Sequence, residues 1–276
     1  MNAPAYARNA PSPLRAHKTL GAAAALWFVT ALLGQCAFVA YVISFYGGAA
    51  MARRFDKWNE VLVGGYVRGG FTGNVALSAH LAFAVVITVA GLVQLVPQLR
   101  TRAPALHRWN GRLYLVTAFV VTLSGLYAVW TRGSAGGLSM RIAVSGDGLL
   151  ILLSAALALR HARARRMASH RRWALRTFLL ASGVWFFRVG LMLWILAMGG
   201  PVGVGKHFDG PFVQAWAFGC YLLPLLVLQL YFHAQARPGA TQKYLTAVLV
   251  ACLAIATGGG MVGALVAMWL PHMGGK

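Results

Sequence analysis

The sequence has few charged residues, and acidic residues are the scarcest. Its 276 residues include only four Asp and Glu, and charged residues make up 11% of the chain. An ordinary soluble domain carries about 25% charged residues, so this chain cannot cover a water-facing surface in the usual way. The composition therefore excludes a soluble globular domain. With so few carboxylates in the chain, a catalytic carboxylate pair is not expected either.

Cysteine is rare as well. Cys36, Cys220 and Cys252 all lie inside apolar runs, and their spacing matches no zinc or iron–sulfur site. We interpret them as small buried apolar residues. The sequence also lacks a Walker loop, a Rossmann fingerprint, His-Glu-x-x-His and Gly-x-Ser-x-Gly. No catalytic residue and no metal ligand is predicted, and the absence of these motifs favours a protein that is not an enzyme.

What the sequence has in abundance is long apolar runs. A helix needs about 20 mainly apolar residues to cross a bilayer, and tilt extends the usable range. Seven runs qualify, at residues 20–45, 76–96, 113–130, 142–159, 177–198, 212–232 and 244–270. They lack the alternation of a transmembrane β-barrel. The predicted fold class is therefore all-α, a single polytopic transmembrane helix bundle of about seven spans at residues 20–270.

Lys and Arg are unevenly divided between the connections. With the N-terminus inside, the cytoplasmic pieces hold sixteen and the outer pieces eight, and Arg188 lies within a run. The positive-inside rule then predicts an N-in/C-out protein of the bacterial inner membrane. Residues 1–19 become a cytoplasmic tail and 271–276 an external one. The net charge of +21 follows from topology, so no nucleic-acid partner is expected. The partner implied is the lipid bilayer, and small-residue ridges in the last run also allow a homo-oligomer or another membrane partner.

Polar residues inside the apolar runs are the main candidates for a site. Asp147 and Arg188 are the full charges within the runs. An isolated charge at the bilayer centre costs at least ~2.5–3.5 kcal/mol, so we expect the two to pair. His80 and Gln94 share a small or polar face of the run 76–96, and His80 lies at a compatible depth in the outer half. We predict an intramembrane polar site of these four residues, which binds or passes a small solute or a proton. A purely structural ion pair is the alternative.

A second polar cluster precedes two of the runs on the cytoplasmic side. His107-Arg108-Trp109 comes before the third run, and His170-Arg171-Arg172-Trp173 comes before the fifth. The match indicates two related helical hairpins, or the chance similarity of two basic, Trp-bearing boundaries. His107 and His170 occupy equivalent places, which makes them candidate axial ligands of a haem b. They are equally well explained as interfacial residues, and no cofactor is predicted in the leading hypothesis.

This cluster and His80 upstream carry a resemblance to a known family: Pro104-x-x-His107-Arg108-x-x-Gly111-Arg112-x-Tyr114, followed by His170-Arg171-x-Trp173-x-x-Arg176. The pattern resembles the bacterial predicted-membrane-protein family called domain of unknown function 2306. The resemblance covers about residues 76–190 and leaves the first, sixth and seventh runs outside. The family has no established activity, so the resemblance implies the topology and this choice of residues.

Three functional hypotheses remain at this point. The leading one is a non-enzymatic membrane protein with a polar pocket in its outer half. A looser similarity to four-helix cytochrome b proteins implies the second, a haem b electron carrier that exchanges electrons with quinone. The third is a structural or assembly protein without a ligand.

Overall fold

The computed structural model describes residues 13–274, and all regular structure in that range is helical. The long helices and their short companions follow one another in this order: α1 (Pro13–Val42), η2 (Ile43–Gly47), α2 (Gly48–Met51), η3 (Phe55–Glu60), α3 (Phe71–Leu95), α4 (Pro97–Arg102), α5 (Pro104–Arg132), α6 (Gly137–Arg163), α7 (Met167–Ala181), α8 (Gly183–Met198), α9 (Pro211–Ala236), α10 (Ala240–Ala264), η4 (Leu265–Trp269) and α11 (Leu270–Met273).

Six helices are long and apolar enough to cross a membrane, and the bent pair α7–α8 makes a seventh if it is counted as one span. The 25 residues of α3, for example, extend about 38 Å at 1.5 Å per residue, more than the roughly 30 Å of a bilayer's hydrocarbon core. The predicted all-helical bundle of about seven spans is confirmed. The first turns of α1 include residues 13–19, and the rest of the predicted N-terminal tail and residues 275–276 lie outside the described residues.

The fifth predicted span differs from the prediction, because it is broken rather than straight. Helices α7 and α8 meet at an angle of 56°, and Ser182 between them leaves the helical region with ψ of 1°. The Ser182 hydroxyl donates to the Phe178 carbonyl at 2.8 Å and accepts a hydrogen bond from the Gln35 amide at 3.0 Å. Ser-Gly pairs are a common cause of sharp kinks, and Gly183 follows directly.

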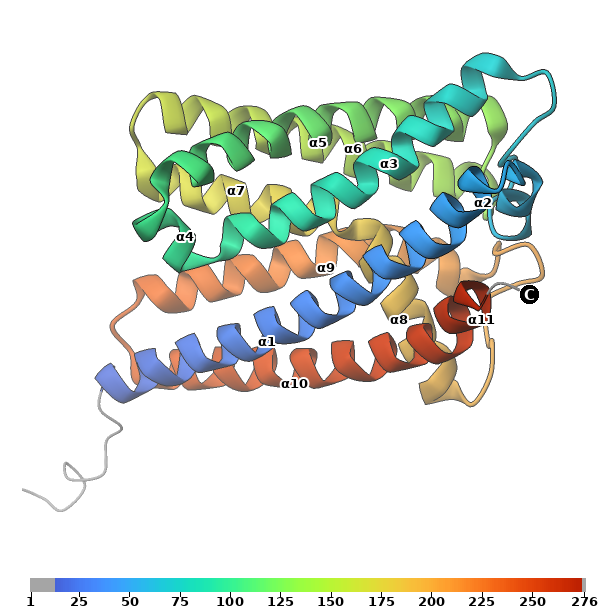
Figure 1. Ribbon diagram of the computed structural model, residues 1–276. Helices are drawn as coiled ribbons and strands as arrows, with labels where there is room; N and C mark the ends of the chain where they lie inside the picture. The colour runs from blue at the N-terminus through green and yellow to red at the C-terminus, as the bar shows by residue number, and fades with distance from the viewer. Residues whose placement is uncertain (1–12, 275–276) are drawn as a thin grey trace, which may run out of the picture.

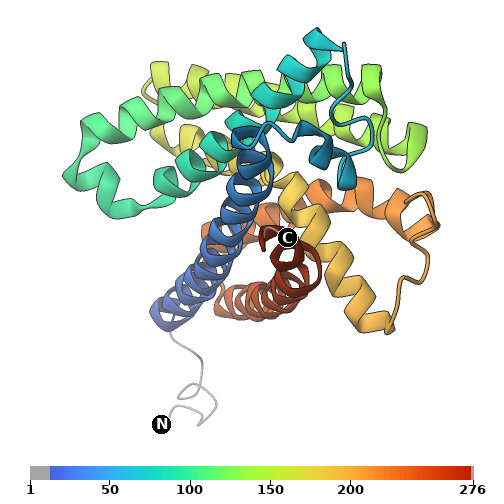
Figure 2. The same cartoon turned by 45° about the vertical axis from the view of Figure 1, so that its right-hand side comes forward.

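The spans pack as two groups (Figures 1 and 2). Helices α3, α5, α6 and α7 lie together, and α1, α8, α9 and α10 form the other group, with α1 also touching α3. One end of the bundle holds the start of α1, α4 and the α6–α7 and α9–α10 turns (Figure 1); we call it the α6–α7 end. The opposite end, with the α5–α6 turn and α11, is the α5–α6 end. The start of α1 and the end of α11 therefore lie at opposite ends, as an odd number of crossings requires.

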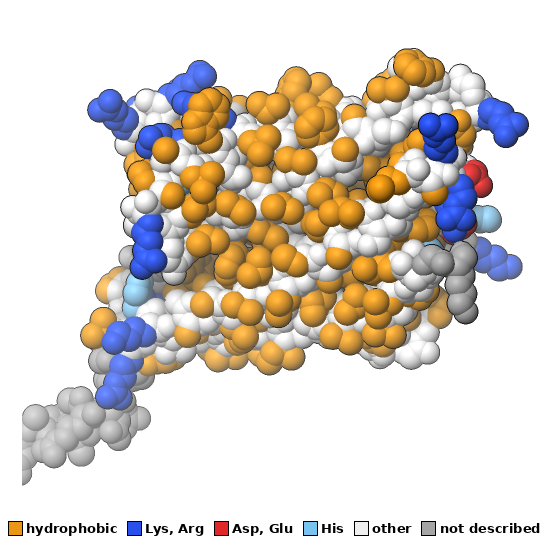
Figure 3. All heavy atoms as spheres, viewed as in Figure 1, with side chains coloured by type: hydrophobic (Ala, Val, Ile, Leu, Met, Phe, Trp, Pro, Cys, Tyr) orange, Lys and Arg blue, Asp and Glu red, His pale blue; other side chains and the backbone are white. Residues whose placement is uncertain are grey.

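The outer surface fits a bilayer. Hydrophobic side chains cover the middle of the face in Figure 3, and Lys and Arg gather at its two ends. Many large apolar residues on the spans are exposed, including Leu123, Leu149 and Ile255. Lipid is the solvent that accepts such a surface, because these side chains lose nothing by facing hydrocarbon.

The long connection between α2 and α3 closes the α5–α6 end. The Trp58 indole of η3 donates to the Tyr46 carbonyl at 3.1 Å, which ties the connection to the end of the first span. From the other side, Arg132 at the end of α5 donates to the Gly70 carbonyl at 3.1 Å and to Asn74 Oδ1 at 2.8 Å. A Cβ on Gly73 would overlap the Arg132 guanidinium, so a glycine is needed for this clamp.

Candidate functional site

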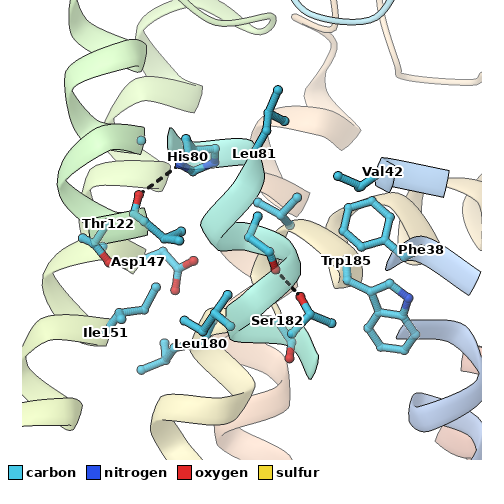
Figure 4. Close-up of a pocket in the computed structure, with 18 of the residues that line it drawn as sticks. Phe38, Val42, His80, Leu81, Thr122, Asp147, Ile151, Leu180, Ser182 and Trp185 are labelled. Carbon is cyan, nitrogen blue, oxygen red and sulfur yellow. Dashed lines mark hydrogen bonds between the residues drawn. The ribbon is translucent and has the colours of Figure 1, made fainter. Parts of the chain in front are cut away.

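A partly open cavity of about 190 Å³ is lined by α1, α3, α5, α6 and the broken α7–α8 pair. We call it the polar cavity. His80, Asp147 and Arg188, which the sequence analysis placed at matching depths, all line it. Figure 4 shows His80 of α3 and Asp147 of α6 facing the same space, with Ser182 of the α7–α8 break across from them. The polar residues of three different spans therefore meet in one place.

His80 is held against α5. Its Nδ1 lies 3.0 Å from the Val121 carbonyl oxygen (Figure 4), and because a carbonyl only accepts, Nδ1 is the donor. The Ser124 hydroxyl lies 3.5 Å from the same nitrogen. Gly125 leaves room for the ring, since a Cβ there would lie 2.9 Å from the imidazole Cε1. With Nδ1 occupied, Nε2 is the nitrogen that remains for chemistry in the cavity.

Asp147 faces the break in the fifth span. Its Oδ1 is buried and finds no hydrogen-bond partner in the described part of the chain. Its Oδ2 lies 2.7 Å from the point where a side chain on Gly183 would begin. The first residue of α8 therefore has to be a glycine for the carboxylate to occupy this position. The carboxyl group lies at the junction of α7 and α8, and no Lys, Arg or His of residues 13–274 forms an ion pair with it.

Arg188 lines the same cavity but does not pair with Asp147, so that prediction is wrong. Both residues are described, and no ion pair within 4.0 Å joins them. The Arg188 guanidinium donates instead to the Val184 carbonyl at 3.2 Å and lies 5.4 Å from the centre of the Phe38 ring on α1. The estimate of matching depth assumed a straight fifth span. The 56° bend directs α8 away from the course of α7, and Arg188 faces α1.

Gln94 does not belong to the polar cavity, although it shares a helix with His80. The two residues are fourteen positions apart, about 21 Å along the helix axis. The Gln94 amide donates to the His107 carbonyl at 3.1 Å near the α6–α7 end. A glycine at position 111 leaves space for this amide, because a Cβ there would lie 2.5 Å from Gln94 Nε2. A shared helix face gives the direction of a side chain and not its depth, which is why this grouping failed.

The polar cavity contains further groups that sequence reasoning missed. Eleven buried side-chain polar atoms of residues 13–274 lack a partner, and six of them belong to residues that line this cavity. Besides Asp147 Oδ1, they are Gln35 Oε1, Tyr46 Oη, Tyr114 Oη, Thr122 Oγ1 and Trp185 Nε1. Tyr114 was recognised through the family pattern. Gln35 carried the clearest unused signal, as an amide in the middle of an apolar run.

The family is decided by comparison with known sequences. Residues 77–232, more than half of the chain, match the family described as "Predicted membrane protein (DUF2306)". The chain belongs to this family. No curated protein and no solved structure matches it. The expected family core, 76–190, was too short, because the match continues through the sixth run at 212–232. Membership establishes a membrane protein and brings no activity with it.

The family pattern that carried the resemblance lies mostly at the α6–α7 end of this DUF2306 protein. His107 and His170 sit in the first turns of α5 and α7 and lie within electrostatic range of each other. His170 Nδ1 donates to the Ala158 carbonyl at 2.9 Å, which fastens α7 to α6. Arg108 and Arg171 are exposed. His80 and Tyr114 are the exceptions, since both line the polar cavity.

Each half of this pattern contains the same kind of contact, an arginine side chain over a tryptophan ring. The Arg112 guanidinium lies 4.6 Å from the centre of the Trp109 ring, and that of Arg176 lies 4.6 Å from the centre of the Trp173 ring. In each case the Arg follows the Trp by three positions, which places both on one face of the helix. Arg176 donates in addition to Gln229 Oε1 on α9 at 2.9 Å. The equivalent contacts on α5 and α7 follow from the repeated Trp-x-x-Arg spacing, and they are expected both for two related hairpins, α3–α5 and α6–α7, and for a chance similarity.

Proposed function

We propose that the protein binds a proton or a small polar solute in the polar cavity and passes it on, with Asp147 and His80 as the exchanging groups. The observation that supports the proposal is that six of the residues lining this one cavity each have a buried polar atom without a partner among the described residues. A buried polar group left without a partner costs about 1–3 kcal/mol. Six such costs would be comparable to the whole stability of a typical protein, about 5–15 kcal/mol. Water or a polar ligand in the cavity removes that cost.

The cavity is large enough for this role. A single water needs about 10–15 Å³ of such space, so 190 Å³ accommodates several waters or one small solute. Thr122 and Tyr114 carry hydroxyls that donate and accept, and Gln35 Oε1 accepts. Connected waters between such groups form a path along which a proton moves from one acceptor to the next. Asp147 and His80 Nε2 are the two acceptors in the cavity that can hold it.

Apolar rings support a binding site rather than an open pore. Towards the α6–α7 end the cavity is lined by the aromatic rings of Tyr114 and Phe178, which both lie close to Gly91. A Cβ on Gly91 would lie 3.0 Å from the Tyr114 ring and 3.1 Å from the Phe178 ring. We propose that passage beyond these two rings requires Phe178 to move. The proposed exchange is therefore gated, and slow compared with diffusion through a channel.

The test is proton movement into proteoliposomes that contain a trapped pH-sensitive dye, driven by a potassium diffusion potential. We expect the protein to raise proton uptake above that of protein-free vesicles, and Asp147→Asn to abolish the increase. Asp209→Asn is the matched control, because it makes the same chemical change at an exposed position in the α8–α9 connection. Equal uptake by the two variants, with both folded by size-exclusion chromatography, would contradict a role for Asp147.

His80 supplies a second arm of the same test. His80→Gln keeps a hydrogen-bond donor for the Val121 carbonyl but removes the basic Nε2. We expect it to lower uptake while leaving the thermal midpoint close to that of the parent. If uptake stays unchanged, His80 is a structural link between α3 and α5 and the exchange rests on Asp147.

A further inference from the structure

A second and larger cavity, of about 620 Å³, lies between α1, α4, α7, α8, α9 and α10. We call it the apolar cavity. It reaches the α6–α7 end of the bundle, where Gln98 of α4 and Arg171 of α7 line it. Phe178 lines both cavities, and every other residue of the apolar cavity's lining is absent from that of the polar cavity. The proposed exchange site therefore leaves this space unexplained.

Aromatic rings and small residues shape the apolar cavity. The Trp27 and Phe186 rings stack on one wall with centroids 6.3 Å apart, and the Trp216 indole lies against Gly190, where any Cβ would overlap it. Ala24 and Ala256 on α1 and α10 leave the space between the helices open. Binding pockets for small molecules measure about 300–1,000 Å³ and are mainly apolar with a few placed polar groups. The apolar cavity matches that description, and its walls lie among the spans, so lipid is the medium around it.

The charge at the rim favours an anion. The four acidic residues of the sequence are Asp56, Glu60, Asp147 and Asp209, and none lies in α4, α7 or the turns of the α6–α7 end. On the face in Figure 3, the acidic side chains are likewise confined to the α5–α6 end. The exposed guanidinium of Arg171 therefore has no carboxylate of its own chain to pair with at this end. The Arg171 guanidinium lies close enough to Tyr231, on the cavity wall, for the two side chains to interact electrostatically. The Tyr231 hydroxyl accepts a hydrogen bond from the Gln235 amide at 3.1 Å.

We propose that the apolar cavity binds an anionic phospholipid, with an acyl chain against Trp27 and Phe186 and the phosphate at Arg171 and Gln98. A guanidinium donates two parallel hydrogen bonds to a phosphate, and the Gln98 amide adds a third donor. Basic pockets between transmembrane helices are suited to such head groups. A free phosphate ion would make no favourable contact with the apolar walls. A neutral lipid would carry no net negative charge to pair with the Arg171 guanidinium. The combination of both features points to the amphiphile.

The experiment is a lipid titration of the detergent-purified protein followed by native mass spectrometry. Phosphatidylglycerol and phosphatidylcholine with identical chains are compared, so that only the head group differs. We expect phosphatidylglycerol to bind more tightly, and Arg171→Gln to weaken its binding by at least about tenfold, as expected for lost hydrogen bonds to a charged group. Arg102→Gln is the matched control, because Arg102 is exposed at the same end but does not line the cavity.

A second pair of variants tests the chain-binding part. Ala256→Phe fills the cavity from α10, and Ala24→Phe fills it from α1. At least one should remain folded, and in it we expect binding of both lipids to fall. Equal affinity for the two lipids, an Arg171→Gln variant that behaves like Arg102→Gln, or a neutral isoprenoid that co-purifies in place of phospholipid would overturn the proposal. None of these results bears on proton uptake through the polar cavity, so the two proposals fail separately.

Discussion

The fit between Gly125 and His80 gives the sharpest test of the polar cavity. Gly125 lies in the interior of α5, where a glycine is unfavourable unless something requires it. A Cβ at this position would lie 2.9 Å from the His80 Cε1 and 3.1 Å from its Nδ1. The ring cannot yield freely, because Nδ1 is bonded to the Val121 carbonyl at 3.0 Å. Gly125→Ala should therefore displace the imidazole.

The magnitude follows from three effects. Overpacking costs about 1–3 kcal/mol, and loss of the His80 hydrogen bond costs about 0.5–1.5 kcal/mol. Replacing a helical glycine by alanine returns about 0.5–1 kcal/mol. The expected net loss is therefore about 0.5–4 kcal/mol. Gly259→Ala in α10 is the control, since no atom lies within 4 Å of its added Cβ. That variant should gain about 0.5–1 kcal/mol.

The assay is reversible unfolding in mixed micelles, with Gly125→Ala measured in the parent and in a His80→Ala background. Removal of the imidazole removes the clash, so the sign of the effect should reverse: alanine at 125 destabilises the parent and stabilises the His80→Ala protein. A cycle of this kind isolates the interaction between two contacting residues. If Gly125→Ala behaves like Gly259→Ala in the parent, or costs the same in both backgrounds, then His80 does not occupy the described position.

Three further predictions concern topology, charge and colour. Reporter fusions in the α9–α10 turn and behind the last residue should report opposite sides of the membrane, with the turn inside; a shared side would mean that the last helix does not span. A double-mutant cycle on Asp147→Ala and Arg188→Ala should give a coupling energy below the ~3–5 kcal/mol that breaking a buried ion pair costs, because the two groups share a cavity but no contact joins them; a coupling in that range would show an ion pair. Protein from haem-replete cells should lack a reduced α-band, because neither His107 nor His170 lines either cavity. A band that disappears in the double alanine variant of these histidines would establish the haem pair instead.

The sequence was sufficient for the number and type of spans, because the signal for a transmembrane helix is its length and composition. Depth was also predictable, since the rise per residue is constant along a helix. On that basis His80 and Asp147, on different spans, were predicted to lie at one level, and both line the polar cavity. The rotation and tilt of each span depend on the helices that pack against it. The sequence of one apolar run does not show which helices these are.

The misplaced pair shows that limit. Arg188 was expected beside Asp147 because both depths agreed, but the break at Ser182 changes the direction of everything that follows it. The signal was a Ser-Gly pair within an apolar run, which by itself is compatible with a straight helix. At the break, the Ser182 hydroxyl accepts a hydrogen bond from Gln35, which is 147 positions away in the sequence. A contact of that separation is visible only after the fold is known.

The same break explains how one span serves two cavities. Adjacent residues near it face opposite sides: Leu180 and Trp185 line the polar cavity, and Leu179 and Phe186 line the apolar one. A straight helix would carry both walls along one axis, whereas the 56° bend lets α7 flank the polar groups of α3 and α6 while α8 leans on α10. Phe178 borders both spaces, so any movement that opens the polar cavity towards the α6–α7 end also alters the wall of the apolar cavity. The broken span, with Phe178, is therefore the element that the two cavities share.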